Sequence, residues 1–121
     1  MIKEIQKPNI DFKFWFENDC KFYYDEENKE YFIEDENNNK FYFNLNGYVH
    51  RFNKPAVERF NGVNIWIEDG KEHRLDGPSY INRNLIQFWI NNHYCSEKYF
   101  AKKTNHLICK FCGQFCKQGC F

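Results

Sequence analysis

The sequence predicts an all-β fold: an elongated antiparallel sheet of repeated β-hairpins, followed by a short cysteine-rich C-terminal element. Three observations predict it. Aromatic residues make up 21% of the 121 residues, and aromatic side chains favour strands. Alanine, the best helix former, occurs only at positions 56 and 101. Asn-Gly and Asp-Gly pairs, which favour tight hairpin turns, recur along the chain.

The N-terminal third alternates aromatic runs with acidic and asparagine-rich turns. Four strands are predicted here, near residues 12–16, 20–25, 29–34 and 40–44. We expect them either to extend the same sheet as the rest of the chain or to fold over one face of it and supply the second layer of a core. Nine acidic residues fall between positions 17 and 36. Such a run is interpreted as a solvated face or as a docking surface.

A repeat of 23 residues begins near residue 41. From Asn46 onward the turn signals alternate at spacings of about 15 and 8 residues, and a fixed period of this size is typical of repeat architectures. Aligning residues 41–63 with residues 64–86 places Gly47 on Gly70, His50 on His73, Arg51 on Arg74, Pro55 on Pro78 and Phe43 on Trp66. A third, degraded copy at 87–98 keeps Trp89 but carries Ser96-Glu97 in place of His-Arg. The predicted repeat domain therefore covers residues 1–100.

The His-Arg pairs follow a turn glycine in both full copies. A motif that occurs twice, one repeat apart, is better explained by the needs of the repeat than by one active site. Gly70 supplies a left-handed turn residue, Pro78 ends a strand, and Arg74 satisfies carbonyl groups or Asp76 at that corner. The alternative is that His50 and His73 lie close together and bind a metal ion or an anion.

The aromatic residues of the repeats form the candidate contact surface. Trp66 points away from Ile65 and Ile67 in a strand, and the 23-residue shift predicts one row along the sheet. The row is either a core ladder or an exposed strip that contacts a partner protein or stacks on bases. The candidate partner-binding residues are Phe43, Trp66, Trp89, Arg51 and Arg74.

Residues 101–121 form the predicted cysteine-rich tail. Cys109, Cys112, Cys116 and Cys120 supply four thiolates, the ligand set of a tetrahedral Zn²⁺. His106 is a replacement ligand. Two alternatives stay open: a buried stripe of free thiols along one helix face, and disulfides. The isolated Cys20 and Cys95 are expected in the core.

Overall charge and motifs exclude several classes of function. Seventeen basic residues balance 17 acidic ones, which gives no general argument for a nucleic-acid partner. No apolar run reaches the roughly 20 residues that span a bilayer. The first residues lack the apolar region of a signal peptide, so a cytoplasmic protein is expected. The chain has neither a phosphate-binding glycine loop nor a nucleophile elbow, and we do not expect an enzyme.

The units FYFNLNGYVHRFNKPA and IWIEDGKEHRLDGPS resemble the aromatic-x-x-Asn-Gly-x-x-His-Arg-x-Asp-Gly-Pro-Ala repeats of phage and large-virus proteins. These are similar in period to MORN repeats, which stack β-hairpins in one elongated sheet. The resemblance covers about residues 41–98. It implies a viral accessory protein that binds a host protein in the host cytoplasm, in its most concrete form an inhibitor of a host defence enzyme such as a CRISPR effector. The alternatives are a nucleic-acid or nucleotide binder that uses a zinc-bound basic tail, and a structural virion component that self-associates through open sheet edges.

Overall fold

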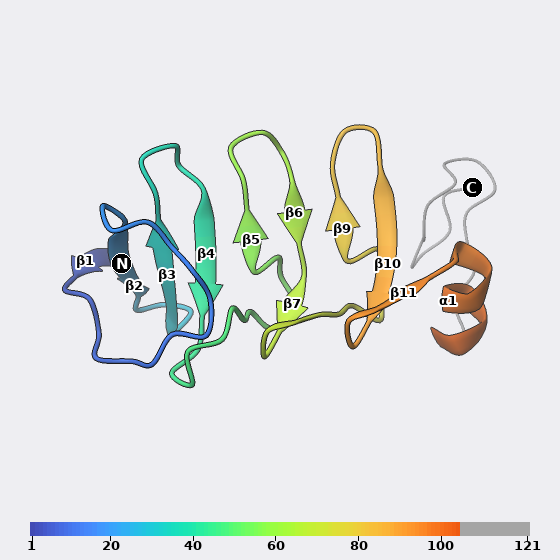
Figure 1. Cartoon of the computed structure of the whole chain (residues 1–121), viewed down its shortest axis with the longest axis horizontal. Coiled ribbons are helices and arrows are strands. Elements are labelled where there is room, and N and C mark those ends of the chain that lie inside the picture. The colour runs from blue at the N-terminus through green and yellow to red at the C-terminus, as the bar shows by residue number, and fades with distance from the viewer. Residues whose placement is uncertain (105–121) are drawn as a thin grey trace.

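The computed structural model describes residues 1–104, which fold as one long, nearly single-layered sheet (Figure 1). Nine strands form an antiparallel sheet in the order β1-β2-β3-β4-β5-β6-β9-β10-β11, and β7 and β8 form a separate hairpin. The order is almost that of the sequence, so the chain advances steadily along the sheet. The predicted all-β fold, an antiparallel sheet built from hairpins, is confirmed.

The elements of this part of the chain are short. The strands are β1 (Ile2–Ile5), β2 (Lys21–Asp25), β3 (Glu30–Glu34), β4 (Lys40–Phe43), β5 (Val57–Glu58), β6 (Asn64–Ile65), β7 (Ile67–Glu68), β8 (Lys71–Glu72), β9 (Tyr80–Ile81), β10 (Ile86–Ile90) and β11 (His93–Cys95), and the helix is α1 (Glu97–Thr104). Three of the four strands predicted in the N-terminal third are present as β2, β3 and β4. The prediction near residues 12–16 is wrong, because this stretch pairs with no strand.

Residues 12–16 instead cross one face of the sheet. Their alternating pattern places Phe12, Phe14 and Phe16 against the cluster of Phe22 and Phe43, so the alternation serves packing onto a face and not pairing within a ladder. This agrees with the second alternative drawn from the sequence, in which part of the N-terminal region covers the sheet. The first strand of the sheet is β1, which the sequence pattern did not predict.

Backbone hydrogen bonds show that the repeat is offset by one residue from the predicted alignment. The N–H of His50 donates to the carbonyl of Tyr42 over 2.9 Å, and the N–H of His73 donates to that of Trp66 over 3.0 Å. Trp66 is therefore equivalent to Tyr42, and the predicted match with Phe43 is wrong. In the third unit Phe88 takes this place, because the N–H of Arg51 donates to Ile67, directly after Trp66, and the N–H of Arg74 donates to Trp89, directly after Phe88.

Turn length explains the offset. The hairpin formed by β4 and residues 48–50, which we call the first small hairpin, closes through a three-residue loop that ends at Gly47, where φ is +89°. The equivalent turn of the next unit has only two residues, Asp69 and Gly70, with φ of +49° and +78°. Both forms are common hairpin connections, and both require left-handed residues. The spacing of equivalent residues is thus 24 for Tyr42 and Trp66, 23 for His50 and His73, and 22 for Trp66 and Phe88, whereas the predicted alignment used a constant 23.

One face of the sheet, which we call the arginine face, carries a row of aromatic and small side chains. Backbone bonds of 2.8 Å join Tyr42 to Ala56 and Trp66 to Ser79, so these residues lie side by side on neighbouring strands. The row runs through Tyr23, Phe32, Tyr42, Ala56, Trp66, Ser79 and Phe88. Ala56, Ser79 and Phe88 are almost completely buried.

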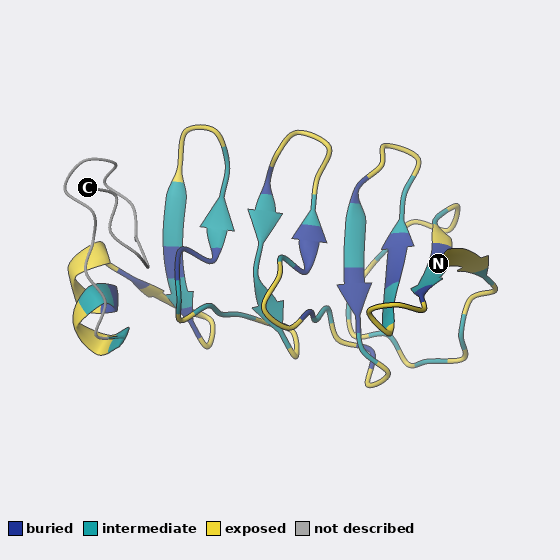
Figure 2. Cartoon of the chain, turned by 180° about the vertical axis from the view of Figure 1, so that it is seen from behind, coloured by how far each residue is buried: buried dark blue, intermediate teal, exposed yellow. Residues whose placement is uncertain are grey.

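The opposite face carries a second row, with one residue from each of eight strands. It runs through Ile5, Phe22, Ile33, Phe41, Val57, Ile65, Tyr80 and Gln87. Residues 6–20 cover this face over β2–β4 and reach no further than β4 (Figure 1). They close the N-terminal core around Phe22, Ile33 and Phe43. Figure 2 shows the molecule from the arginine-face side; β2–β5 and β10 contain buried positions, and Ser79, directly before β9, is also buried.

Candidate protein-binding surface

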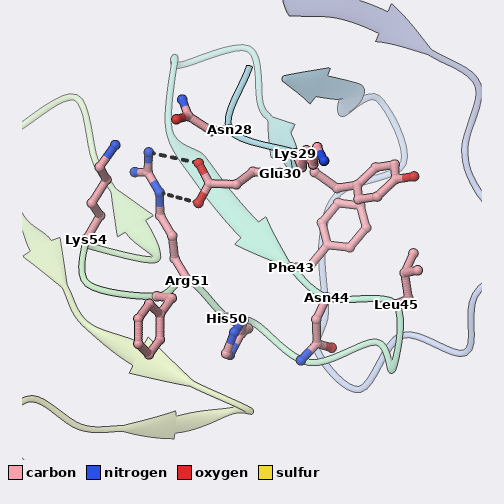
Figure 3. Close-up of a pocket in the computed structure, with 11 residues that line it drawn as sticks. Asn28, Lys29, Glu30, Phe43, Asn44, Leu45, His50, Arg51 and Lys54 are labelled. Atoms are coloured by element: carbon pink, nitrogen blue, oxygen red, sulfur yellow. Dashed lines mark hydrogen bonds and ion pairs between the residues drawn. The ribbon is translucent and has the colours of Figure 1, made fainter. Parts of the chain in front are cut away.

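Arg51 is the most buried charged side chain of the first repeat unit, with only 8% of its side chain exposed. Its Nε and Nη2 donate to the two carboxylate oxygens of Glu30 on β3, over 2.9 and 3.3 Å (Figure 3). Nη1 donates to the carbonyl of Pro55 over 3.3 Å. The guanidinium lies 3.7 Å from the ring centroid of Tyr42. Burial also raises the pKa of Tyr42 to about 12.

Arg74 repeats this arrangement one unit later. Its Nε donates to Asp76 over 2.9 Å, its Nη1 donates to the carbonyl of Pro78 over 3.0 Å, and its guanidinium lies 4.0 Å from the centroid of Trp66. Arg74 and Asp76 are only two residues apart, whereas Arg51 pairs with Glu30 on a distant strand. The Arg74 side chain is also more exposed, at 22%. The predicted contacts of Arg74 with Asp76 and with carbonyl groups are confirmed.

The third unit replaces the arginine with a helix. The Phe100 ring of α1 lies 4.6 Å from that of Phe88, the third aromatic residue of the row. Phe88 and Phe100 form the C-terminal core together with Ile90 and Cys95. By its pairing with Phe88, Cys95 takes the position of the histidine, so Ser96 takes that of the arginine, and the predicted match of Ser96-Glu97 with His-Arg is one residue late. The helix is thus a cap on the repeat array.

The two histidines join each repeat unit to the next. The N–H of Asp69 donates to Nδ1 of His50 over 2.9 Å, and the N–H of Asn91 donates to Nδ1 of His73 over 3.0 Å. An amide N–H can only donate, so Nδ1 must be the acceptor in both rings. These bonds support the structural interpretation of the histidines, because the same ring nitrogen is used in the same way in both units.

Two hollows lie beside the arginine corners. The first, of about 540 Å³, lies next to Arg51 and is lined by Leu45, His50, Phe52 and Lys54 among others (Figure 3). The second, of about 350 Å³, lies next to Arg74 and is lined by Phe52 and Leu75. Phe52 therefore stands between the two hollows and forms a wall of both.

The apolar residues at the rim of these hollows are far more exposed than their surroundings. Phe52 directly follows Arg51 and is 68% exposed, and Leu75 directly follows Arg74 and is 50% exposed. Leu45, at the first small hairpin, is 66% exposed. We call these three residues the apolar rim. The sequence does contain a pattern that predicts these positions, since both His-Arg pairs are followed by a large apolar residue. Comparison of identical residues in the two copies misses it, because one copy has Phe52 and the other has Leu75.

The predicted partner-binding aromatics do not form one strip. Phe43 is 4% exposed and lies in the N-terminal core. Trp66 lies under Arg74 on the arginine face. Trp89 lies on the opposite face, where its Nε1 donates to Gln87 over 3.1 Å and its ring contacts Tyr94 at 5.6 Å. The predicted single row of these three residues is therefore wrong, because the turn length shifts their register.

Carboxylates outside the repeat corners occur in two notable places. Glu17, Asp19 and Glu36 bring carboxylate oxygens within 4.8 Å of one another, but all three are exposed, and such acidic groups are common without a metal ion. Glu72 on β8 lies opposite Ile67, and burial raises its pKa to about 7. It occupies the position of Val49 in the preceding unit, so an acidic residue replaces an apolar one in the repeat.

The cysteines fall into two sets. Cys95 is buried and Cys20 is half-buried, and both are free thiols. Burial raises the pKa of the Cys20 thiol. The predicted zinc ligands, Cys109, Cys112, Cys116 and Cys120, and the replacement His106 lie outside the described residues. The zinc site therefore stays a prediction.

Comparisons with known proteins gave no match to any family model, curated protein or solved structure. In the described part of the chain, α1 spans only eight residues, and no helix there is long and apolar enough to cross a bilayer.

Proposed function

We propose that this chain is a protein-binding repeat module and that the apolar rim is its contact surface. The observation that carries the proposal is the exposure of Phe52 and Leu75, which are 68% and 50% exposed at equivalent positions of two units. Large apolar side chains that recur in this way beside hollows are typical of interaction sites, and isolated exposed ones are not.

The corners beneath the rim support this use. Arg51 and Arg74 are each held by a carboxylate, a carbonyl group and an aromatic ring. Residues attached to such fixed corners lose little further freedom when a partner binds, and preorganisation of this kind improves affinity. The rim is also repeated along the sheet, so a partner that lies along the array meets one apolar contact in each of the first two units.

For the partner we propose a host protein, in its most specific form a defence enzyme such as a CRISPR effector. Only the resemblance of the repeats to those of phage and large-virus proteins supports this choice. The direct measurement is target cleavage by a purified CRISPR effector with and without this protein in molar excess. Undiminished cleavage by representative effectors would remove this partner class and leave the binding surface to be tested separately.

The surface is tested with a double variant and a matched control. Phe52→Ser with Leu75→Ser removes the two repeated residues of the rim, whereas Phe60→Ser alters a residue that also follows an arginine and is 71% exposed, but lies in the β5–β6 loop. We expect a host-lysate protein captured by the parent to be lost with the double variant and kept with Phe60→Ser. Equal capture by all three proteins would contradict the proposed surface.

A further inference from the structure

The two hollows beside the arginine corners differ in the charge of their linings. Apart from histidine, three cations and one carboxylate line the first hollow: Lys29, Arg51, Lys54 and Glu30. One cation and two carboxylates line the second: Arg74, Glu68 and Asp76. Equivalent places of two repeat units therefore carry an excess of opposite charge, on either side of the wall that Phe52 forms between them.

This difference arises in the loop that follows each arginine. The Nη1 donor of each arginine reaches the carbonyl of the proline four residues later, so residues 51–55 are equivalent to residues 74–78. The second loop contains an acidic residue, Asp76, which pairs with the arginine of its own unit. The first arginine takes its carboxylate from Glu30 on β3 instead. The first loop therefore needs no acidic residue of its own, and it carries Lys54.

In the first hollow the lysines supply the charge that is left over. Arg51 is paired with Glu30 and lies 3.7 Å from a carboxylate oxygen of Glu58. Lys29 and Lys54 are both exposed, and they lie on either side of the Arg51–Glu30 pair in the view of Figure 3. Neither lysine forms an ion pair within residues 1–104. An acidic group of a partner can therefore pair with them without breaking an existing contact.

In the second hollow the charge that is left over is negative. Arg74 and Asp76 pair with each other. Glu68 of β7 is half-buried and forms no ion pair with any residue that the structure describes. Its cross-strand neighbour Lys71 lines a different hollow. A basic group of a partner would gain a carboxylate here, whereas an acidic group would be repelled.

The spacing of the two hollows suits the side chains of one extended segment. Each repeat unit contributes two strands to the sheet, so equivalent points of neighbouring units lie roughly 10 Å apart. Every second residue of an extended chain points the same way, and three such residues span about 13 Å. The middle side chain can then contact Phe52 while each outer side chain reaches one of the two hollows.

We propose that the apolar rim binds an extended partner segment with an acidic, an apolar and a basic residue at three alternating positions. The acidic residue faces Lys29 and Lys54, the apolar residue contacts Phe52, and the basic residue faces Glu68. The opposite charges of the two hollows fix the direction of the segment, because the reverse direction brings like charges together. This inference rests on the proposed binding function of the rim and adds the chemistry of the partner. A nucleic-acid backbone, which is negative throughout, does not match the second hollow.

The test uses end-blocked peptides and the full-length protein labelled with nitrogen-15. The matched peptide is Asp-Ser-Phe-Ser-Lys. Its controls have two acidic ends (Asp-Ser-Phe-Ser-Asp), two basic ends (Lys-Ser-Phe-Ser-Lys) or two neutral ends (Asn-Ser-Phe-Ser-Gln). Titration of the amide chemical shifts gives the Kd of each peptide. We expect the matched peptide to bind at least about fivefold more tightly than each control, because it alone forms two exposed ion pairs.

Charge variants assign each end of the peptide to a hollow. Lys54→Glu should weaken the matched peptide at least about threefold and change the neutral peptide less than about twofold. Lys98→Glu makes the same change at an exposed lysine of α1 and should change neither Kd by more than about twofold. Glu68→Gln should weaken the matched peptide and leave the peptide with two acidic ends no weaker. Lys54→Gln is a milder form of the first change, and thermal melting confirms that each variant is folded.

Failure of the charge pattern and failure of the rim give different results. If all four peptides bind equally and Phe52→Ser weakens every one of them, the rim binds apolar residues and the proposed charge pattern is wrong. Tightest binding by the peptide with two acidic or two basic ends would also overturn the pattern, because only one sign of charge would then be recognised. If no peptide binds, or if Phe52→Ser changes nothing, the proposed contact surface fails together with the pattern.

Discussion

The two faces of this sheet are covered in different ways. On the arginine face each aromatic residue of the repeats is covered by one side chain from its own or the next unit: Arg51, Arg74 and finally Phe100. On the opposite face a single segment, residues 6–20, covers several strands at once and then stops. A cover encoded in each repeat extends with the array, whereas a cover supplied once has a fixed reach. This difference is why the cover of the arginine face recurs from unit to unit, whereas residues 6–20 pack only against the N-terminal strands.

Removal of Arg51 should be the most damaging change to the arginine face. Arg51→Met keeps the apolar stem but leaves the half-buried Glu30 without its partner, and we expect a loss of about 3 kcal/mol in the free energy of unfolding. The same change at Arg74 should cost about 1 kcal/mol, because Asp76 is 46% exposed and water can solvate it. Urea unfolding of both variants measures the difference.

A second variant separates burial of the charge from loss of the stack. Arg51→Met combined with Glu30→Gln removes both charges, and it should recover part of the stability lost by Arg51→Met alone. If Arg51→Met and Arg74→Met have equal costs, then the long-range ion pair to β3 contributes nothing beyond the aromatic contact.

The cover of the opposite face is tested at Gly47. A Cβ at this position would overlap the carbonyl oxygen of Asp11, and the N–H of Lys13 donates to the carbonyl of Gly47 over 2.8 Å. Gly62 has the same φ of +89° but nothing within 4 Å of an added Cβ. We expect Gly62→Ala to cost about 1 kcal/mol from backbone strain and Gly47→Ala about 2 to 3 kcal/mol, because it also displaces the segment.

Proteolysis distinguishes the two glycine variants further. Displacement of the cover should expose residues 6–20 to cleavage in Gly47→Ala and leave them protected in Gly62→Ala. Equal stability and equal cleavage of the two variants would show that residues 11–13 do not fix the segment to the first small hairpin.

Glu72 gives the opposite face a dependence on pH. Its folded pKa of about 7 lies above the ordinary value of 4.5, so the folded state binds more protons than the unfolded state between these values, and stability falls as pH rises through this window. Glu72→Gln lacks the penalty. It should be more stable than the parent at pH 8 by about 1 kcal/mol, an amount reduced because the carboxyl is partly exposed, and equal to it at pH 4. A difference in melting temperature between Glu72→Gln and the parent that is the same at every pH from 4 to 8 would show that the Glu72 carboxyl does not cause the pH dependence.

The smallest effect concerns the row beneath the arginines. Ser79 is equivalent to Ala56 and is completely buried, and its hydroxyl has no hydrogen-bond partner among the residues that the structure describes. Ser79→Ala should therefore raise the free energy of unfolding by about 0.5 kcal/mol. A loss of more than about 1 kcal/mol would reveal a hydrogen bond of Ser79 that this interpretation lacks.

Turn chemistry and aromatic content were enough to predict the fold class, and they placed β2, β3 and β4 correctly. The register of the repeats was not predictable from sequence similarity alone. One extra residue in the turn before Gly47 makes Trp66 equivalent to Tyr42 and not to Phe43. In a strand such a shift changes the face on which a side chain lies. That single residue is why the predicted aromatic row was wrong.

The site was predicted in part for a related reason. His50, Arg51, His73 and Arg74 recur, and recurrence indicated correctly that they are corners of the repeat. Glu30, which holds Arg51, lies in a different region of the sequence, and no local pattern connects the two. Phe52 and Leu75 share only size and polarity, so identity between the copies did not reveal them.

The interface between units is itself repeated. The first pair of units is joined by the bonds from Arg51 N–H to the Ile67 carbonyl, from Gly70 N–H to the Val49 carbonyl and from Asp69 N–H to His50, and each has a counterpart at the next junction. A new unit inserted between the existing two would therefore find a matching donor and acceptor set on both sides. It would add two strands, or roughly 10 Å, to the long sheet without altering either end. The length of the molecule is thus adjustable by tandem duplication of a segment of about 23 residues, with α1 always closing the final unit.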